Sequence, residues 1–126
     1  MLQTDWKNLC LPENIVRSGI ALSGLYDLEP LLQCSENERL MLDIDEVNIA
    51  SPMKQNPESL APLLLGYGVN EPPDMHRQTL QYFDTFKDKS PKMECVAIPD
   101  ADHFDVVNVL SDENSDLFKR ILSFIL

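Results

Sequence analysis

The chain has 126 residues, a length that fits one domain with a core of ordinary size. Its 21 acidic residues outnumber the 10 basic ones, which gives a formal net charge of −11 and a pI near 4.4. A charge of this sign repels nucleic acid phosphates and anionic lipid headgroups, so we expect neither a nucleic acid nor a membrane as a partner.

Cysteine usage and the N-terminal residues bear on the compartment. Cys10, Cys34 and Cys95 lie far apart with no C-x-x-C spacing. An odd number of thiols suits a reducing compartment better than a disulfide framework. The spacing of these cysteines does not match a zinc site. The chain shows neither a basic leader with an apolar region nor a stretch that approaches about eighteen apolar residues. We therefore expect a cytoplasmic protein that uses no metal and no cofactor.

Short apolar runs alternate with helical patterns in the first half of the chain. Residues 15 to 22 (IVRSGIAL) are β-branched and aliphatic and predict a strand, which Ser23 and Gly24 end. Residues 25 to 50 are more polar, with leucines at helical spacing, and predict two short helices. The continuous apolar run from 60 to 67 (LAPLLLGY) is typical of a strand that is covered on both faces.

The second half of the chain repeats this alternation. Asp74 is placed to cap a helix that begins at Met75. Residues 93 to 98 predict a third strand, and Lys92 and Glu94 indicate a less buried edge position. Ser115 or Asp116 is placed to cap a final amphipathic helix.

This order of elements predicts an α/β fold in which a three-stranded parallel sheet is flanked by helices, in a single domain over residues 1 to 126. The carboxyl ends of parallel strands meet at one edge of a sheet. The loops at 23 to 27, 68 to 74 and 99 to 105 should therefore line one crevice, and a functional site is expected there.

The loop after the third strand carries a histidine. The apolar run stops at Pro99, and the chain then places Asp100, Asp102 and His103 in the loop, ahead of the amphipathic C-terminal stretch. An α/β-hydrolase presents its catalytic base in this way. His103 is therefore the candidate base.

A catalytic histidine needs a carboxylate on the ring nitrogen that faces away from the nucleophile, because the carboxylate fixes the tautomer and stabilises the imidazolium. Glu71 follows the second strand by a few residues and is placed for that role. The order in which the acid precedes the histidine matches the α/β-hydrolase order. Asp102 and Asp105 are nearer to His103 in sequence, but they would point away from its ring or compete for it.

Several segments resemble the C-terminal half of kynurenine formamidase (arylformamidase), an α/β-hydrolase of the esterase and lipase type that cleaves N-formylkynurenine to kynurenine and formate in tryptophan degradation. These segments cover essentially the whole chain: SGLYDLEPLL at 23 to 32, SP at 51 and 52, EPPDMHRQ at 71 to 78 and DADHFDVVNVLSDENSDLF at 100 to 118. The resemblance implies that His103 is the base of a triad and that Glu71 stands at the acid position, where relatives carry Asp or Glu. It also implies a small aryl formamide or ester as substrate.

The resemblance also points to an absence. Members of the family carry an N-terminal half with an HGG-type oxyanion motif and a G-x-S-x-G nucleophile elbow, and neither motif occurs in these 126 residues. The segment MLQTDW resembles the helix that follows the elbow. We therefore expect a partial domain that begins shortly after the nucleophile, keeps the acid and the base, and is inactive alone.

Other polar residues carry weaker functional interpretations. Ser23 lacks the leading glycine of a nucleophile elbow, and Cys34 has no histidine near it in sequence. His76 is better explained as a surface or capping residue. Tyr26 and Asp27 could line the crevice, although Asp27 could equally cap the helix that follows, which we favour. A further acidic run lacks EF-hand spacing and indicates a solvated face rather than a calcium site: Asp43, Asp45 and Glu46.

The alternative to a hydrolase part is a non-catalytic interaction module. If the sheet is cut beside the first strand, the backbone groups around residues 15 to 22 and the apolar faces near them lack partners. We expect a homo-oligomer that forms through the exposed sheet edge or an apolar face, or complementation by a separate N-terminal half.

Overall fold

The computed structural model describes residues 4, 6–12 and 14–126, and most of the segment MLQTDW lies outside them. Its three strands are β1 (Gly19–Leu22), β2 (Leu63–Gly68) and β3 (Met93–Ile98). The α-helices are α1 (Asn37–Leu40), α2 (Ile44–Ala50), α3 (Pro73–Phe86), α4 (Asp105–Asn108) and α5 (Asp116–Ile125). Short 3₁₀ helices complete the list: η1 (Lys7–Leu9), η2 (Glu29–Gln33), η3 (Pro52–Lys54), η4 (Lys87–Lys89) and η5 (Val109–Ser111).

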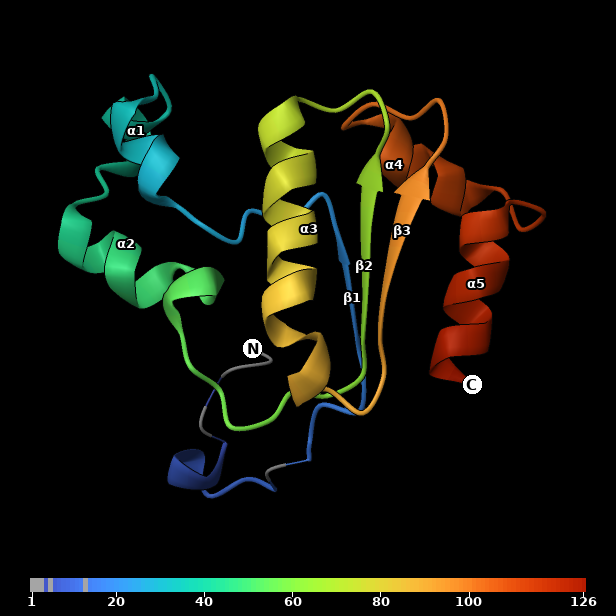
Figure 1. Cartoon of the computed structure of the whole chain (residues 1–126), viewed down its shortest axis with the longest axis horizontal. Coiled ribbons are helices and arrows are strands. Elements are labelled where there is room, and N and C mark those ends of the chain that lie inside the picture. Colours follow the sequence, from blue (N-terminus) through green and yellow to red (C-terminus); the bar gives the residue numbers. More distant parts are fainter. Residues whose placement is uncertain (1–3, 5, 13) are drawn as a thin grey trace.

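The three strands form one parallel sheet in the order β1-β2-β3. In this register Leu22 lies opposite Gly66, which in turn lies opposite Val96. Figure 1 shows α3 on one face of the sheet and α4 and α5 on the other. The predicted α/β class, with a three-stranded parallel sheet and flanking helices, is confirmed.

The first two strands begin later than the sequence predicts, and Pro62 explains both differences. Gly19 donates its N–H to the Pro62 carbonyl at 2.8 Å, which is where the pairing of β1 with β2 starts. Proline has no N–H of its own, so the ladder does not extend past it towards the N-terminus. The third strand has the predicted bounds of 93 to 98, and β3 lies at an edge of the described sheet, as expected.

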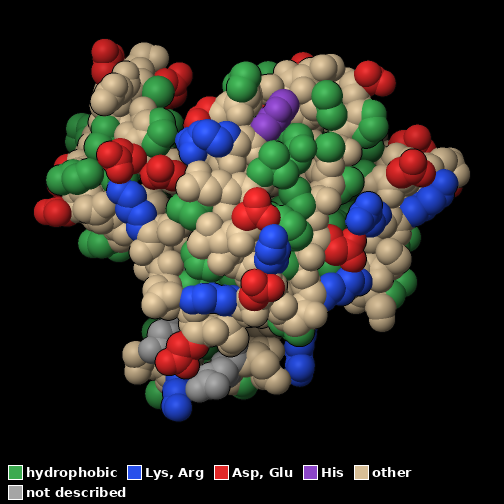
Figure 2. Space-filling model, viewed as in Figure 1, with side chains coloured by type: hydrophobic (Ala, Val, Ile, Leu, Met, Phe, Trp, Pro, Cys, Tyr) green, Lys and Arg blue, Asp and Glu red, His purple; other side chains and the backbone are tan. Residues whose placement is uncertain are grey.

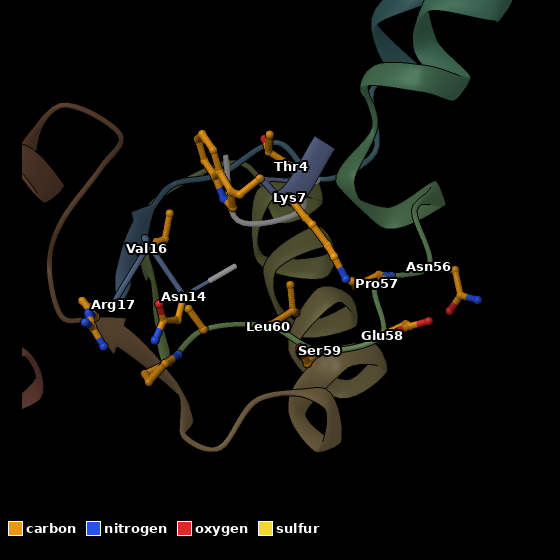
Figure 3. A pocket seen from close by; sticks show the side chains of 13 residues that line it. Thr4, Lys7, Asn14, Val16, Arg17, Asn56, Pro57, Glu58, Ser59 and Leu60 are labelled. Atoms are coloured by element: carbon orange, nitrogen blue, oxygen red, sulfur yellow. The ribbon is translucent and has the colours of Figure 1, made fainter. Parts of the chain in front are cut away.

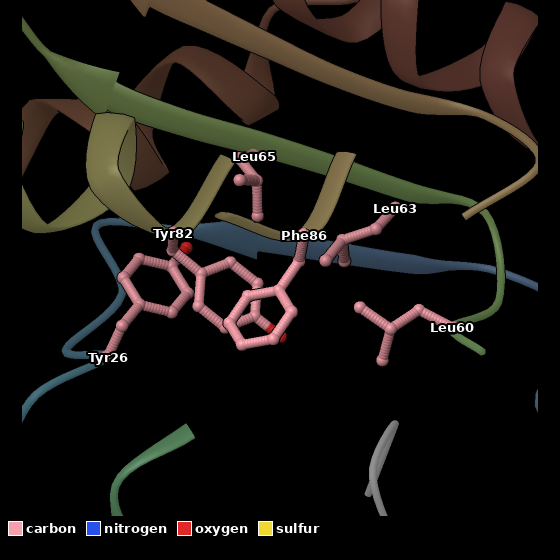
Figure 4. Packing of buried hydrophobic residues seen from close by; sticks show 6 residues of the cluster. All are labelled: Tyr26, Leu60, Leu63, Leu65, Tyr82 and Phe86. Atoms are coloured by element: carbon pink, nitrogen blue, oxygen red, sulfur yellow. The ribbon is translucent and has the colours of Figure 1, made fainter. Parts of the chain in front are cut away.

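The face of the sheet towards α3 is closed by aromatic rings. Leu63 and Leu65 of β2 are almost fully buried against Tyr82 and Phe86 of α3 (Figure 4). The ring of Tyr26 stacks on that of Tyr82 with centroids 4.4 Å apart. Alternate residues of a strand face opposite sides of a sheet, so the intervening residues of β2 and β3 face α4 and α5. A second cluster forms there from Ile98, Ala101, Val106 and Leu117.

Helix α5 has the cap that the sequence predicts, but α3 does not. The Ser115 hydroxyl accepts a hydrogen bond from the Phe118 N–H at 3.1 Å, as predicted. The predicted cap at Asp74 is wrong, because α3 starts at Pro73, a residue type favoured in the first turn for lack of an N–H. The Asp74 carboxylate instead accepts hydrogen bonds within α3, from the Gln78 amide and the Arg77 guanidinium, each at 2.8 Å.

Residues 25 to 50 form the short elements η2, α1 and α2, where two short helices were expected, and η3 follows before β2. The acidic run in this segment has a local structural role. The Asp43 carboxylate accepts from the Glu46 N–H at 2.9 Å, and the Glu46 carboxylate accepts from the Asp43 N–H at 3.1 Å. This capping box starts α2.

Charged side chains of both signs are interspersed on the face shown in Figure 2, with hydrophobic side chains between them. Over the part of the chain that the structure describes, no helix is long and apolar enough to cross a membrane.

Candidate active site

The loops that follow β2 and β3 meet at the carboxyl edge of the sheet, at the top of Figure 1. Val69 donates its N–H to the Ile98 carbonyl at 3.0 Å, and Asn70 donates to the Ala101 carbonyl at 2.9 Å. These two bonds fasten the loop after β2 to the loop after β3. The loops that carry Glu71 and His103 are therefore neighbours.

Glu71 and His103 are in direct contact. His103 Nδ1 lies 2.8 Å from Glu71 Oε1, and the other oxygen of the carboxylate, Oε2, accepts a hydrogen bond from the Gly68 N–H at 2.8 Å. The Glu71 side chain is fully buried, whereas 52% of the His103 side chain is exposed. A carboxylate only accepts, so Nδ1 carries the proton and Nε2 is left as the basic nitrogen of the neutral ring.

Two opposing influences set the pKa of Glu71. Burial would raise it, because a carboxylate loses its hydration. The nearby Ser23 hydroxyl, the hydrogen bonds from His103 and the Gly68 N–H, and the positive charge that His103 can carry outweigh burial and hold the pKa of Glu71 below its ordinary value. The carboxylate is therefore ionised at neutral pH and ready to accept from the imidazole.

A pH dependence of stability follows from this lowered pKa. A group whose pKa is lower in the folded state contributes stability above its unfolded pKa, about 4.3 for Glu, and loses that contribution as the pH falls through its folded pKa. We expect Glu71→Gln to lower the free energy of unfolding at pH 7, and we expect the difference from the wild type to shrink as the pH falls below about 4.3. Urea unfolding between pH 7 and pH 3 measures it.

The control for this experiment is Glu113→Gln, because Glu113 is exposed. It should change stability little at any pH in the series. A Glu71→Gln difference that stays constant from pH 7 to pH 3 would show that Glu71 is not held as an anion by its neighbours.

His76 holds the turn that carries the acid. Its Nε2 lies 2.8 Å from the Gly68 carbonyl oxygen, so Nε2 carries a proton and donates. Its ring packs against Tyr67 with centroids 4.8 Å apart. The Gly68 backbone is thus bound by Glu71 through its N–H and by His76 through its carbonyl. His76 is half-buried near the start of α3, where a surface or capping residue was expected, and its bond reaches back to the end of β2.

The close approach of the two loops requires a glycine at position 68. A β-carbon on Gly68 would lie 2.3 Å from the Ala101 carbonyl oxygen and 2.9 Å from a Val106 methyl group. The first of these atoms is backbone and does not move without the loop. We expect Gly68→Ala to lower the free energy of unfolding by about 1–3 kcal/mol or more, measured by urea unfolding.

Gly66→Ala is the matched control for Gly68→Ala, two residues earlier in the same strand. Its β-carbon would lie 2.7 Å from Leu22 Cδ2, the end of a flexible side chain that can rotate away. The loss of stability should therefore be smaller. Equal losses in the two variants would contradict the assignment of a backbone clash at position 68.

The aspartates around His103 accept hydrogen bonds from backbone N–H groups of their own turn. Asp102 Oδ1 accepts from the N–H groups of Phe104 at 2.8 Å and Asp105 at 2.9 Å, which starts α4. The Asp105 carboxylate accepts from the Asp102 N–H at 3.4 Å. Neither carboxylate has a hydrogen bond to the His103 ring among the described residues, as the sequence analysis expected.

One residue that the sequence analysis did not consider, Gln78, fixes the loop after β1. Its buried Oε1 accepts from the N–H groups of Tyr26 and Asp27, each at 2.9 Å. The signal in the sequence is an amide on the face of α3 that also carries Thr79 and Tyr82. Tyr26 packs in the core and does not line the crevice. The expected cap at Asp27 is not the cap of η2, which is Leu28, but the Asp27 carboxylate accepts from the Glu29 N–H at 3.1 Å where η2 begins.

A hollow of about 800 Å³ lies at the opposite end of the sheet (Figure 3). Residues that precede β1 and β2 line it, among them Val16, Arg17, Leu60 and Pro62. It is therefore separate from the acid–base pair, which lies where the strands end. Among the described residues, no group of three or more His, Cys, Asp or Glu side chains is placed to hold a metal ion.

Known proteins resemble this chain in sequence and in structure. No protein-family profile matches the chain. The kynurenine formamidases of Danio rerio and Salmo salar are each 25% identical to it, over 130 and 128 residues. The chain resembles kynurenine formamidase. The alignments take in 99% and 97% of this chain but 44% and 43% of those two proteins, so the chain spans less than half the length of the kynurenine formamidases it matches.

A solved structure shares the same arrangement of elements. It is a candidate thioesterase from Silicibacter sp. TM1040, with 29% sequence identity and a TM-score of 0.73. The match covers 91% of this chain and 42% of that one. The matches in sequence and in structure thus both cover most of this chain and less than half of the protein that it resembles.

Proposed function

We propose that this chain is the acid- and base-bearing part of a kynurenine-formamidase-like hydrolase with the α/β-hydrolase fold, in which Glu71 and His103 are two members of a triad. One observation carries the proposal: the 2.8 Å contact between His103 Nδ1 and the buried Glu71 carboxylate, on loops after neighbouring parallel strands. The similarity to kynurenine formamidases over nearly the whole chain supports it.

The geometry fits the work of a general base. Glu71 fixes the tautomer of His103 with the proton on Nδ1, so Nε2 is free to take the proton of a serine hydroxyl and later to give it to the leaving group. Glu71 then stabilises the imidazolium that forms. The half-exposed ring leaves room for a nucleophile and a substrate to approach. The substrate class we propose is a small aryl formamide or ester.

The nucleophile has to come from polypeptide beyond these 126 residues, because they contain no G-x-S-x-G motif. Ser23 does not replace it. The Ser23 hydroxyl is buried and lies near Glu71, the residue bonded to Nδ1 of His103, whereas a nucleophile has to reach Nε2. We therefore propose a partial domain that does not turn over substrate alone.

Turnover assays test this proposal. The 126-residue chain is compared with a polypeptide extended to include the coding sequence upstream of Met1, using N-formylkynurenine and a p-nitrophenyl ester. We expect hydrolysis above background only when the extension supplies a serine on a nucleophile elbow. Hydrolysis by the 126 residues that His103→Ala abolishes would contradict the proposed inactivity of the isolated chain.

The free edge of β1 favours a second candidate function, an interaction module. Gly19 and Ser23 donate their N–H groups to β2 at 2.8 Å, so the backbone groups of Ile20 and Leu22 between them point to the other edge. In the described part of the chain, no strand pairs with that edge, and the Ile20 side chain is 39% exposed. An open edge of this kind recruits another strand.

For this second candidate we propose that the β1 edge binds either another copy of the chain or a separate N-terminal half. Sedimentation of the purified chain over a range of concentrations tests self-association. A homo-oligomer that dissociates on dilution is expected. A monomer at all micromolar concentrations would exclude self-association and leave only complementation by another polypeptide.

A further inference from the structure

Ser23 has an unusual backbone and an unusual hydroxyl. It directly follows β1 with φ at 53°, in the left-handed region that few residues other than glycine adopt. Its Oγ is buried and makes no hydrogen bond of regular geometry with any described residue. Buried polar groups without regular partners and strained backbone both gather at functional sites. The two features coincide at this position.

The register of the sheet places Ser23 beside the acid. Leu22 pairs with Gly66, and the Ser23 N–H donates to the Gly66 carbonyl at 2.8 Å, so Ser23 lies level with the end of β2. The N–H of Gly68, two residues further along β2, holds the Glu71 carboxylate. The Ser23 hydroxyl is near enough to that carboxylate to act on it as a hydrogen-bond donor.

The Glu71 carboxylate has room for this third donor. Its two oxygens offer about four lone-pair positions, of which His103 takes one on Oε1 and Gly68 takes one on Oε2. A hydroxyl hydrogen rotates about the C–O bond, so a donor that is close but imperfectly aligned can still turn towards the anion. An unused hydroxyl buried at this place would cost stability that alanine would not.

We propose that Ser23 is a positioning residue, whose hydroxyl donates to Glu71 and holds the carboxylate in the orientation that the His103 ring requires. The proposal rests on the proposed function in one respect, the pairing of Glu71 with His103 as acid and base. It gives the loop after β1 a part in the site, although that loop lies two strands away from the histidine.

A titration of Glu71 can test this role, because few charged groups act on the residue. His103 is the charged group that acts on Glu71 in the described structure, and Asp102 interacts with His103 in turn. A hydroxyl that donates to the carboxylate favours the ionised form and lowers the pKa of Glu71, so removal of the Ser23 hydroxyl should raise the midpoint of the titration.

The experiment follows the ¹³C carboxyl resonance of Glu71 against pH in the 126-residue chain, assigned by its absence from the Glu71→Gln spectrum. Ser23→Ala and Ser23→Gly both remove the hydroxyl, but only glycine also relieves the positive φ. We expect the Glu71 midpoint to move to higher pH in both variants. Ser111→Ala removes an exposed hydroxyl that is bonded to the Asn108 carbonyl and not to Glu71 or His103, and should leave the midpoint unchanged.

An unchanged midpoint in both Ser23 variants would overturn the proposal. A rise in Ser23→Ala alone would also overturn it, because the cause would then be backbone strain and not the hydroxyl. If Ser23→Ala does not fold, Ser23→Gly decides.

The His103 Nδ1 proton resonance separates this inference from the proposed function. If Glu71→Gln leaves that resonance unchanged, the acid–base pair itself fails. If Glu71→Gln abolishes the resonance while the Ser23 variants leave the Glu71 midpoint in place, only the role of Ser23 fails.

Discussion

Replacement of His103 with alanine is expected to lower kcat/KM by about 10³- to 10⁶-fold, the range found when a triad loses its base. The polypeptide assayed is the one extended upstream of Met1 to include the proposed serine nucleophile. The serine hydroxyl would then have no group to take its proton, and the buried Glu71 carboxylate would lose the partner that it orients. Hydrolysis of a p-nitrophenyl ester and of N-formylkynurenine measures the loss.

Two further variants sharpen this test. His103→Gln keeps a polar side chain of similar reach but has no basic nitrogen, so its loss of activity should be as large as that of His103→Ala. Lys119→Ala alters an exposed position on α5 and should leave kcat/KM unchanged. Activity of His103→Ala within about tenfold of the wild type would show that His103 is not the base.

Leu65→Ala should have the largest effect on stability, a loss of about 2–5 kcal/mol in the free energy of unfolding. Leu65 is fully buried in the central strand and belongs to the cluster that joins the sheet to α3. Truncation leaves a cavity where close-packed aromatic rings cannot easily collapse. Because whole domains are stable by only about 5–15 kcal/mol, the midpoint of urea unfolding should fall far.

The control for Leu65→Ala is Leu80→Ala, a leucine of α3 that is 43% exposed. Its loss should stay below about 1 kcal/mol, since little apolar surface leaves the core. The slope of free energy against urea should be the same in both variants and the wild type. Similar losses at the two positions would mean that the sheet–helix interface is not the core of the domain.

Much of the fold could be predicted from the sequence, since the apolar run of β2 is continuous, that of β3 is interrupted only by Glu94, and their ends are marked by glycine and proline. The proximity of Glu71 and His103 was predictable for the same reason, because adjacent parallel strands end at one edge and bring their loops together. That argument needs only the order and direction of strands.

The supporting contacts could not be predicted, because they join side chains to distant backbone groups. Gln78 binds N–H groups 51 and 52 residues earlier in the chain, and no local pattern encodes that separation. The bond from His76 to Gly68 depends on how α3 sits over the sheet. Two boundaries could have been read locally. The pairing of β1 with β2 starts at Pro62 and α3 starts at Pro73, each within a few residues of the predicted position.

The first two turns of α3 are connected both to the loop after β2 and to the loop after β1. They follow directly from the turn of Glu71, and through Gln78 they bind the backbone of Tyr26 and Asp27. A shift of this helix relative to the sheet would displace the loop after Ser23 and pull on the turn of Glu71, whose carboxylate is bound to the end of β2 through Gly68. The distance between the acid and that loop therefore depends on how α3 packs on the sheet.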